Sequence, residues 1–284
     1  MVELRVAVGQ GARNPAGVRM LAGTAADLAV LDARVADCRA CPRLVAWREE
    51  VARTRRAAFA DQAYWGRAVP GFGPPDARIC VVGLAPAAHG ANRTGRMFTG
   101  DRSGEWLYAA LYRAGLASQP TSTGVGDGLM LYGVRITAPV HCAPPENKPT
   151  VAERDACRPW LERELALLAP TLRVFVVLGA FGWSVLWSAL AAAGHPVPAR
   201  RPPFGHGAEV ALPERGWHVL ASYHVSQQNT FTGKLTEPML DAVFARAVEL
   251  AGPPPAVGPA AEGATGPAAE RATGPAAEGG ARPA

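Results

Sequence analysis

The chain has 284 residues and a formal net charge of +5, from 29 Lys and Arg against 24 Asp and Glu. This length is enough to bury a sizeable core, and the basic surplus suits an anionic partner without requiring one. The sequence contains neither an apolar run long enough to cross a bilayer nor a signal-peptide pattern. We therefore expect no membrane span and a cytoplasmic protein.

The first part of the chain combines a weakly patterned segment with a cysteine pair. Residues 1–22 show little periodicity, and we expect a loosely ordered lead-in there. Thr24 and Asp27 have the spacing of a helix cap, and the helix that follows leads to Cys38-Arg39-Ala40-Cys41. A second helix carries Arg43, Arg48, Arg53, Arg55 and Arg56. These arginines form either a solvated helix face or a phosphate-contacting one.

A strand followed by a long glycine-punctuated loop is the central feature. Residues 78–82 are a β-branched apolar run typical of a buried strand, and residues 102–116 have helical spacing of apolar side chains. Between them runs Gly-Leu-Ala-Pro-Ala-Ala-His-Gly-Ala-Asn-Arg-Thr-Gly-Arg-Met-Phe-Thr-Gly-Asp, residues 83–101. Ligands of open α/β sheets bind at that end of the strands, and glycines let a backbone approach them closely. Arg93 and Arg96 can neutralise phosphate.

The rest of the chain alternates strands and helices. Strands are predicted over 133–139, 174–179 and 219–222, and helices over 151–168, 180–193 and 237–251, with Thr150 and Glu153 as a capping box. The pattern predicts an α/β fold over residues 23–251, a three-layer α/β/α domain with a central, mostly parallel four-stranded sheet. Residues 252–284 hold three near-copies of Gly-Pro-Ala-Ala-Glu, and we expect a disordered tail there.

Four cysteines from distant segments can converge on one centre: Cys38, Cys41, Cys142 and Cys157. A set of four thiolates fits either a structural zinc ion or an iron–sulfur cluster. The second pair is more widely split than in zinc ribbons, which favours a cluster without deciding the matter. Cys80 lies inside an apolar strand and is expected to be a core residue.

Three features together resemble the uracil-DNA glycosylase superfamily, in the form of its family 5. They are the loop over residues 83–101, the His224-Val225-Ser226 segment after the last strand, and the layout of the four cysteines. The resemblance covers about residues 36–251. It implies a uracil-DNA glycosylase-like fold, a 4Fe–4S cluster on those cysteines, and a monofunctional enzyme that removes a damaged base from double-stranded DNA. We expect it to act as a monomer.

The resemblance, with the chemistry of base release, assigns expected roles. His224 would hydrogen-bond the departing base, and Phe98 would stack on the flipped base. The backbone at Leu84, Ala85 and Ala87 would bind base edges, with Thr137 beside it. Asn92 is the first candidate for holding the attacking water and Asp101 the second, while the alternative for Asn92 is a turn position. DNA contacts are expected from Arg93, Arg96, Lys148, Ser226, Gln227, Gln228 and Asn229.

Three departures from the superfamily's patterns bear on base choice. Ala85 stands where the classical members have the water-orienting aspartate of Gly-Gln-Asp-Pro-Tyr, and Ala87 stands near their tyrosine that excludes bulky bases. Thr137 and Ala138 occupy a region where relatives often have an asparagine that reads uracil. We therefore expect release of uracil and of other deaminated bases such as hypoxanthine and xanthine. The alternatives are a family 4-like, uracil-specific enzyme and a non-catalytic iron–sulfur protein that senses damaged DNA.

Overall fold

The structure is a computed structural model that describes residues 11–252. Its α-helices are α1 (Pro15–Gly23), α2 (Leu28–Ala36), α3 (Pro42–Thr54), α4 (Ala91–Thr94), α5 (Arg102–Arg113), α6 (Val151–Leu168), α7 (Ala180–Ala192), α8 (Gln227–Phe231) and α9 (Glu237–Ala251). The strands are β1 (Ile79–Val82), β2 (Val134–Thr137), β3 (Val174–Leu178), β4 (Glu209–Leu212) and β5 (Trp217–Ser222). Short 3₁₀ turns cover Ala57–Phe59, Pro145–Asn147 and Pro213–Arg215.

The sheet has the strand order β2-β1-β3-β5-β4, and the first four of these strands are parallel. The four predicted strands and their parallel arrangement are confirmed, but the predicted count of four is wrong, because β4 adds an antiparallel edge beside β5. β4 is short and mostly solvent-facing, with only Leu212 buried. Such a segment lacks the apolar run by which a buried strand is recognised.

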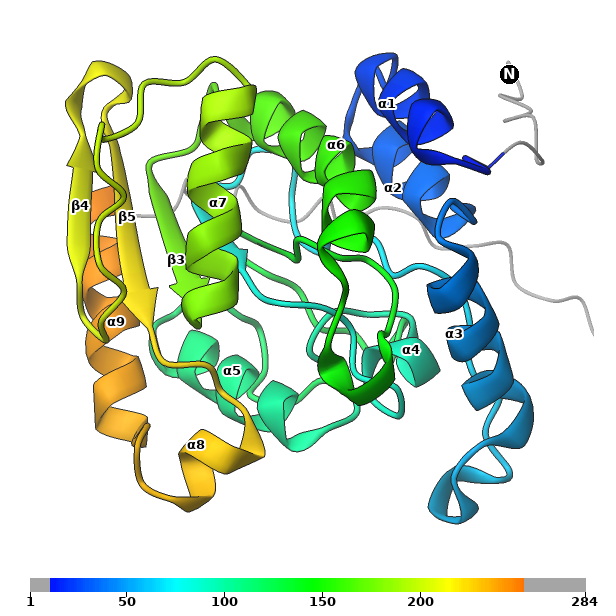
Figure 1. Cartoon of the computed structure of the whole chain (residues 1–284). Helices are drawn as coiled ribbons and strands as arrows, with labels where there is room; N and C mark the ends of the chain where they lie inside the picture. The colour runs from blue at the N-terminus through cyan, green and yellow to red at the C-terminus, as the bar shows by residue number, and fades with distance from the viewer. Residues whose placement is uncertain (1–10, 253–284) are drawn as a thin grey trace, which may run out of the picture.

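Helices cover both faces of the sheet, as predicted (Figure 1). On one face lie α6 and α7, with α1 and α2 packed outside α6, and on the other face lie α5 and α9. Side chains along a strand point alternately to the two faces. In β1, Cys80 and Val82 join the core beneath α6 and α7, while Ile79 and Val81 join the core beneath α5 and α9. The fold is therefore a three-layer α/β/α domain.

The N-terminal segment differs from the expectation in two respects. A helix, α1, occupies residues predicted to be a loose lead-in, and the Asn14 side chain caps it by accepting from Gly17 N at 2.8 Å. Asp27, not Thr24, caps α2, accepting from Val30 N at 2.8 Å. The capping box at Thr150 is confirmed. The expectations for residues 1–10 and for the tail over 253–284 lie outside the described residues.

A buried ionic network joins the edge strand β2 to the helical layer. Arg135 of β2 pairs with Glu164 of α6 and, at 2.6 Å, with Asp32 of α2. Burial raises the pKa of Asp32 to about 6. Thr137 Oγ1 donates to Glu164 Oε2 at 2.5 Å. Because a buried charge without partners is costly, this network fixes the direction in which β2 presents its polar side chains.

Candidate active site

The carboxyl ends of the four parallel strands bring the predicted loops to one edge of the sheet. The loop after β1 starts at Gly83, whose N–H donates to Thr137 O at 2.9 Å. Gly179 follows β3, and a Cβ on it would lie 3.2 Å from His224 Cβ. His224 follows β5. Gly182 lies in the first turn of α7. A Cβ on Gly182 would be only 2.7 Å from Gly83 O, so the absence of a side chain there leaves room for the loop after β1.

Phe98 is held against the start of the loop in a strained conformation. Its φ is +52°, a region that bulky residues rarely adopt and that marks functional sites. A Cβ on Gly83 would approach two Phe98 ring carbons to 2.7 and 2.8 Å, so the ring lies directly on the Gly83 backbone. The Phe98 and His224 ring centroids are 6.0 Å apart with planes inclined by 35°. The structure thus brings the expected stacking aromatic and the expected hydrogen-bond donor together.

His224 is a neutral imidazole at physiological pH. Burial lowers its pKa from 6.5 to about 4, because the protein interior disfavours the charged form. Its carbonyl oxygen accepts from Asn229 Nδ2 at 2.8 Å, which anchors the segment that presents the ring. A neutral imidazole still has one N–H donor. It can therefore hydrogen-bond an oxygen that gains negative charge.

The backbone beside this pair offers donors. Among the described residues, no main-chain acceptor pairs with the N–H groups of Leu84, Ala85 or Ala87. Ala87 O accepts from both Gly90 N and Asn92 N, which closes the loop into a tight turn. Free N–H groups held in a rigid turn suit recognition of a polar ligand edge, as expected from the sequence.

Two expected site residues point elsewhere. The Thr137 hydroxyl is buried and bonded to Glu164, so the expectation that this side chain contacts a base is wrong. Asn92 is fully buried, and its Nδ2 donates to Arg48 O at 3.2 Å and to Ala88 O at 3.4 Å. Its Oδ1 has no partner among the described residues. The Asn92 amide thus braces the loop from within.

Asp101, the second candidate for holding water, lies at the end of the same loop. It caps α5, accepting from Gly104 N at 3.2 Å. Burial is the largest effect on its pKa, which is raised above 3.8. Its carboxylate packs directly against the backbone of Gly90, where no side chain intervenes. Asp101 is a partly buried carboxylate with no cationic ion-pair partner among the described residues, which leaves acceptor capacity for water.

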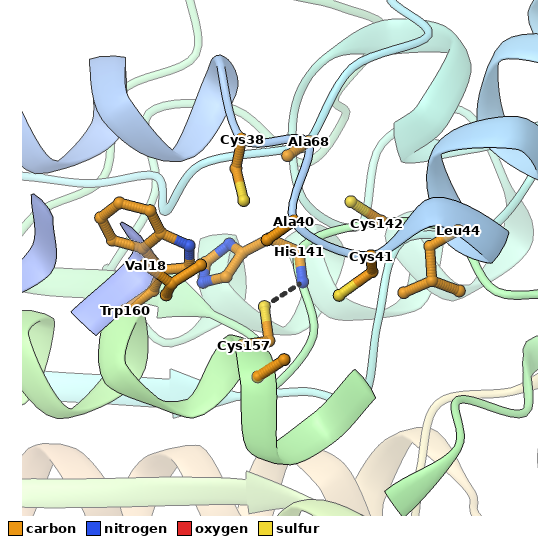
Figure 2. A pocket seen from close by; sticks show the side chains of 11 residues that line it. Val18, Cys38, Ala40, Cys41, Leu44, Ala68, His141, Cys142, Cys157 and Trp160 are labelled. Carbon is orange, nitrogen blue, oxygen red and sulfur yellow. Dashed lines mark hydrogen bonds between the residues drawn. The ribbon is translucent and has the colours of Figure 1, made fainter. Parts of the chain in front are cut away.

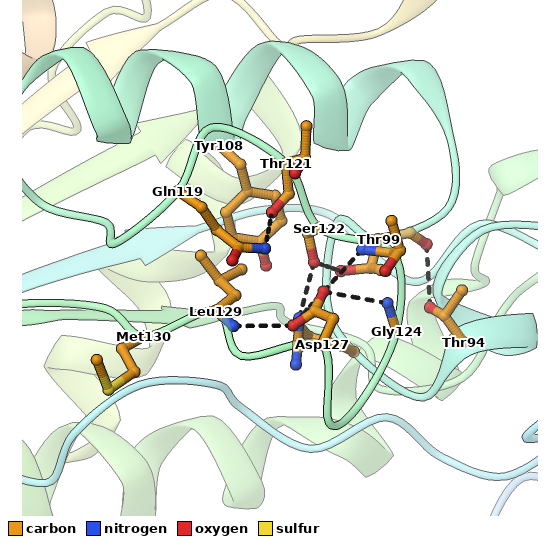
Figure 3. A network of polar contacts seen from close by, with 12 residues as sticks. Thr94, Thr99, Tyr108, Gln119, Thr121, Ser122, Gly124, Asp127, Leu129 and Met130 are labelled. Atoms are coloured by element: carbon orange, nitrogen blue, oxygen red, sulfur yellow. Dashed lines mark hydrogen bonds and ion pairs between the residues drawn. The ribbon is translucent and has the colours of Figure 1, made fainter.

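Arg96 is not available for DNA phosphate, contrary to expectation. It is buried, and its Nη1 contacts both Asp127 carboxylate oxygens at 2.8 Å and Ser122 Oγ at 3.0 Å. Hydrogen bonds from this guanidinium and from backbone N–H groups hold the pKa of Asp127 at about 2, against the opposing effect of burial. Figure 3 shows the network, in which Ser122 also meets Thr99 at 2.6 Å. It ties the segment after Phe98 to residues 122–129.

Arg93 is also engaged, although it is only partly buried. Its guanidinium donates to Gly100 O, to His89 O and to Gln62 Oε1, and it stacks on Phe59 at 3.9 Å. His89 itself bonds Tyr64 Oη through Nδ1 at 3.1 Å. Arg93 therefore clamps the loop rather than projecting as a free cation.

Of the remaining expected DNA contacts, Lys148, Gln227 and Gln228 are exposed, whereas Ser226 and Asn229 are half-buried. Lys148 is 79% exposed and forms a surface ion pair with Glu146 at 3.2 Å. Ser226 begins α8, and Gln227 and Gln228 are exposed in its first turn. Phe231 of α8 is 66% exposed, with the Arg102 guanidinium 4.6 Å from its ring centre. Phe231 is an exposed aromatic residue in a polar segment that was not singled out from the sequence.

The four cysteines surround a common space between α3, α6 and the segment before the Pro145–Asn147 turn (Figure 2). Burial and the neighbouring thiols raise the pKa of Cys41 to about 12. The pKa of Cys142 rises to about 11, mainly through burial, although Arg48 opposes the shift. Thiols that repel one another as thiolates need a cationic centre between them. Within residues 11–252, no group of three or more metal-binding side chains is placed to hold a single ion.

His141 and Trp160 line the same space and were not assigned from the sequence. His141 Nδ1 bonds Val69 O at 2.7 Å, and its main-chain N–H donates to Cys157 Sγ at 3.4 Å. His141 Nε2 and Trp160 Nε1 are buried and without a partner among the described residues. Unpaired buried polar atoms around convergent thiols fit a site made for a bound inorganic group. His141 directly precedes Cys142, and Trp160 lies one helical turn after Cys157 on α6, so the signal in the sequence was their closeness to the cysteines.

Most arginines of the α3 region are paired. This bears on whether they form a solvated helix face or a phosphate-contacting one, which the sequence left open. Arg43 binds Glu153 at 2.8 Å and Arg53 binds Glu50 at 2.7 Å. Arg55 donates to Ala60 O. Arg48 is buried and binds the cysteine region. This helix therefore does not present the row of free cations that a phosphate-binding face would have.

Comparison with known proteins gives a consistent family. The family model described as the uracil DNA glycosylase superfamily matches residues 70–248. A type-5 uracil-DNA glycosylase of Mycobacterium bovis is 56% identical over 232 residues, which are 82% of this chain and 85% of the relative. A type-5 uracil-DNA glycosylase of Thermus thermophilus is 55% identical over 217 residues, 76% of this chain and 94% of the relative.

A type-4 relative is more distant. The type-4 uracil-DNA glycosylase of Pyrobaculum aerophilum is 36% identical over 117 residues, which are 41% of this chain and 51% of that protein. A type-5 enzyme from the same organism is 44% identical over 219 residues, 77% of this chain and 91% of the relative. The similarity to type 5 thus exceeds that to type 4 both in identity and in the length it covers.

Proposed function

We propose, from the premise that this chain belongs to the uracil DNA glycosylase superfamily, that it is a type-5 uracil-DNA glycosylase acting in DNA repair. The observation that carries the proposal is the pairing of Phe98 with a neutral His224 at the carboxyl edge of the sheet. Such a site can stack a flipped base and bind the oxygen on which negative charge gathers as the base leaves.

The reaction breaks the bond between the sugar C1′ and the base nitrogen, and water supplies the oxygen that bonds to C1′. The proton that this water loses ends on the departed base anion. We propose that Phe98 holds the base and that the free N–H groups of Leu84, Ala85 and Ala87 bind its edge. The His224 N–H stabilises the departing anion without losing its proton. Each donor gains strength from burial, because an electrostatic interaction is worth more away from water.

We propose that Asp101, rather than Asn92, holds the attacking water. The Asn92 Nδ2 is committed to two carbonyl groups and its side chain is fully buried. Asp101 retains acceptor oxygens at the end of the same loop. Water can donate to such a carboxylate and so be oriented toward the oxocarbenium-like sugar carbon.

We propose that the pocket also accepts hypoxanthine and xanthine. Ala85 and Ala87 leave no bulky side chain at the loop, and Thr137 is turned away to Glu164. Recognition then depends on backbone donors, which discriminate less than a dedicated side chain does. Release of uracil alone from duplexes that differ only in the damaged base would contradict this.

The cysteine centre fits a 4Fe–4S cluster bound by Cys38, Cys41, Cys142 and Cys157. Four cysteines from distant segments around one space support a polynuclear group over a zinc ribbon. When bound, the cluster supplies positive charge that holds the four thiolates together, so its role here is structural.

The substrate is double-stranded DNA containing the damaged base, and lesion binding uses α8 and Lys148. No helix within residues 11–252 is long and apolar enough to cross a membrane. We propose that the protein acts as a monomer in the cytoplasm, because base excision at a site built from one chain requires no second copy.

A strand-nicking assay tests the function. The full chain is incubated with a labelled duplex containing one uracil and is then treated with alkali. Cleavage only after alkali establishes a monofunctional glycosylase that leaves an abasic site. Intact DNA after alkali, with the protein bound to the duplex, would contradict the proposal.

A further inference from the structure

Arg48 lies deep in the protein between the cysteine centre and the loop of the active site. It is 1% exposed, on α3. Its Nη1 contacts Cys142 Sγ at 2.8 Å, and its Nη2 donates to Cys38 O at 2.9 Å. Its Nε is buried without a partner among the described residues. Arg48 therefore contacts both pairs of cysteines, through Cys38 of the first pair and Cys142 of the second.

The charge on Arg48 lacks a carboxylate partner. Arg43 and Arg53, on the same helix, each form an ion pair with a glutamate. Within residues 11–252, no ion pair joins Arg48 to a carboxylate. A buried guanidinium that is not neutralised is strongly unfavourable. The side chain that it contacts is Cys142, whose sulfur is anionic when it ligates the proposed cluster, so the cluster-bound thiolates would supply the counter-charge.

The backbone of the same residue reaches the active-site loop. Arg48 O accepts from Asn92 Nδ2 at 3.2 Å, and Asn92 lies in α4, within the loop that ends in Phe98 and Asp101. Helices α3 and α4 pack against each other. A buried hydrogen bond thus joins α3, next to the cysteine centre, to α4.

We propose that Arg48 is a positioning residue that balances the charge of the cysteine centre and couples that centre to the base pocket through Asn92. The inference rests on the proposed iron–sulfur cofactor. A donor to a ligating sulfur stabilises the ligand and raises the reduction potential of a cluster, because it favours the more negative reduced state. Loss of the guanidinium should therefore loosen the cluster and make it harder to reduce.

The test compares four variants of the full chain with the wild type: Arg48→Met, Arg48→Lys, Asn92→Ala and the control Arg53→Met. Iron and sulfide content, the rate of cluster loss to a chelator, and the reduction potential report on the cysteine centre. Affinity for a duplex carrying a non-hydrolysable uracil nucleotide reports on the base pocket. Arg53 is the matched control, because it lies on the same helix but pairs with Glu50 at the surface.

Arg48→Met should lose its cluster about tenfold to a hundredfold faster, as expected for one charged hydrogen bond, and its potential should become more negative. Its duplex affinity should also fall. Arg48→Lys keeps the charge and should recover part of the potential, which keeps the test usable if Arg48→Met does not fold. Asn92→Ala should weaken duplex binding while leaving the potential unchanged, and Arg53→Met should match the wild type throughout.

The outcomes separate the two proposals. Wild-type protein without iron and sulfide would overturn the cofactor assignment, and the role of Arg48 with it. A wild type that holds the cluster, with both Arg48 variants unchanged in potential and rate of cluster loss, would overturn the inference alone. A changed potential with unchanged duplex affinity in both Arg48 variants and in Asn92→Ala would overturn the coupling.

Discussion

At the scale of single residues, Phe98 holds a backbone conformation that costs roughly 1–3 kcal/mol. The carbonyl groups on both sides of it are fixed by buried donors. Tyr108 Oη donates to Met97 O at 2.7 Å, and Thr94 Oγ1 donates to Thr99 O at 3.0 Å. These two hydrogen bonds hold the backbone on both sides of Phe98 and so help to offset the strain.

Replacing Phe98 with alanine should remove the stacking platform. Base–aromatic stacking contributes about 1–3 kcal/mol, so KM for a uracil-containing duplex should rise about tenfold to a hundredfold. Steady-state kinetics measures this, with Tyr112→Ala as the control, because Tyr112 is a half-exposed aromatic of α5. Equal KM values in the Phe98 variant and the wild type would rule out the stacking role.

His224→Ala should lower kcat about 10²–10³-fold, as loss of one donor to a developing anion does elsewhere. Binding of the duplex should be retained, since the ring contributes most when the charge develops. Single-turnover kinetics and a binding titration separate the two effects. Retained kcat would mean that another group stabilises the leaving base.

The dependence of stability and activity on pH in the acid range should reflect the lowered pKa of His224. The pKa of His224 is about 4 in the folded protein and 6.5 in the unfolded chain. The contribution of this residue to the free energy of unfolding is therefore complete above pH 6.5, and it declines as the pH falls from 6.5 to about 4. Within that window the active site keeps its neutral imidazole. Titration of the His224 ring protons by NMR should show a midpoint near 4, and a midpoint near 6.5 would contradict the burial argument.

At the scale of elements, residues 122–129 act as a brace for the loop that carries Phe98. Asp127 accepts from Arg96 and also from the backbone of Thr123, Gly124 and Leu129. Ser122 meets Thr99 (Figure 3). One carboxylate therefore orders its own loop and anchors the neighbouring one.

Asp127→Asn should destabilise the protein by about 3–5 kcal/mol, because it leaves the buried Arg96 guanidinium without its counter-charge. Urea unfolding followed by circular dichroism measures this loss. The double variant Arg96→Met, Asp127→Leu removes both charges and should be more stable than Asp127→Asn. A double variant no more stable than the single one would show that the charge pair is not the source of the loss.

The elements and the pocket edge were predictable because their signals are local. Apolar runs identified β1, β3 and β5, and the position of His224 after a strand placed it at the ligand-binding edge. The wrong expectations concern side chains whose partners are remote in sequence. Arg96 finds Asp127, and Thr137 finds Glu164, through packing that no local pattern records. β4 was not predicted, because an exposed edge strand lacks the run of apolar residues that marks a buried strand.

At the scale of the whole molecule, the cysteine centre connects the N-terminal helices to the main domain. Cys38 and Cys41 both precede the start of α3, Cys157 lies in α6, and Cys142 follows β2. Removal of the proposed cluster should lower the melting temperature and weaken DNA binding, because the four cysteines would then no longer tie α3 to α6. Calorimetry before and after chelation of iron measures this. An unchanged melting temperature in iron-depleted protein would contradict a structural role.

This arrangement also sets an order of events during synthesis. Cys38 and Cys41 leave the ribosome well before Cys142 and Cys157, because the residues of β1, α4, α5 and β2 lie between the pairs. The proposed cluster can therefore gain all four of its ligands only after α6 has been translated, so its binding would come late in the formation of the fold.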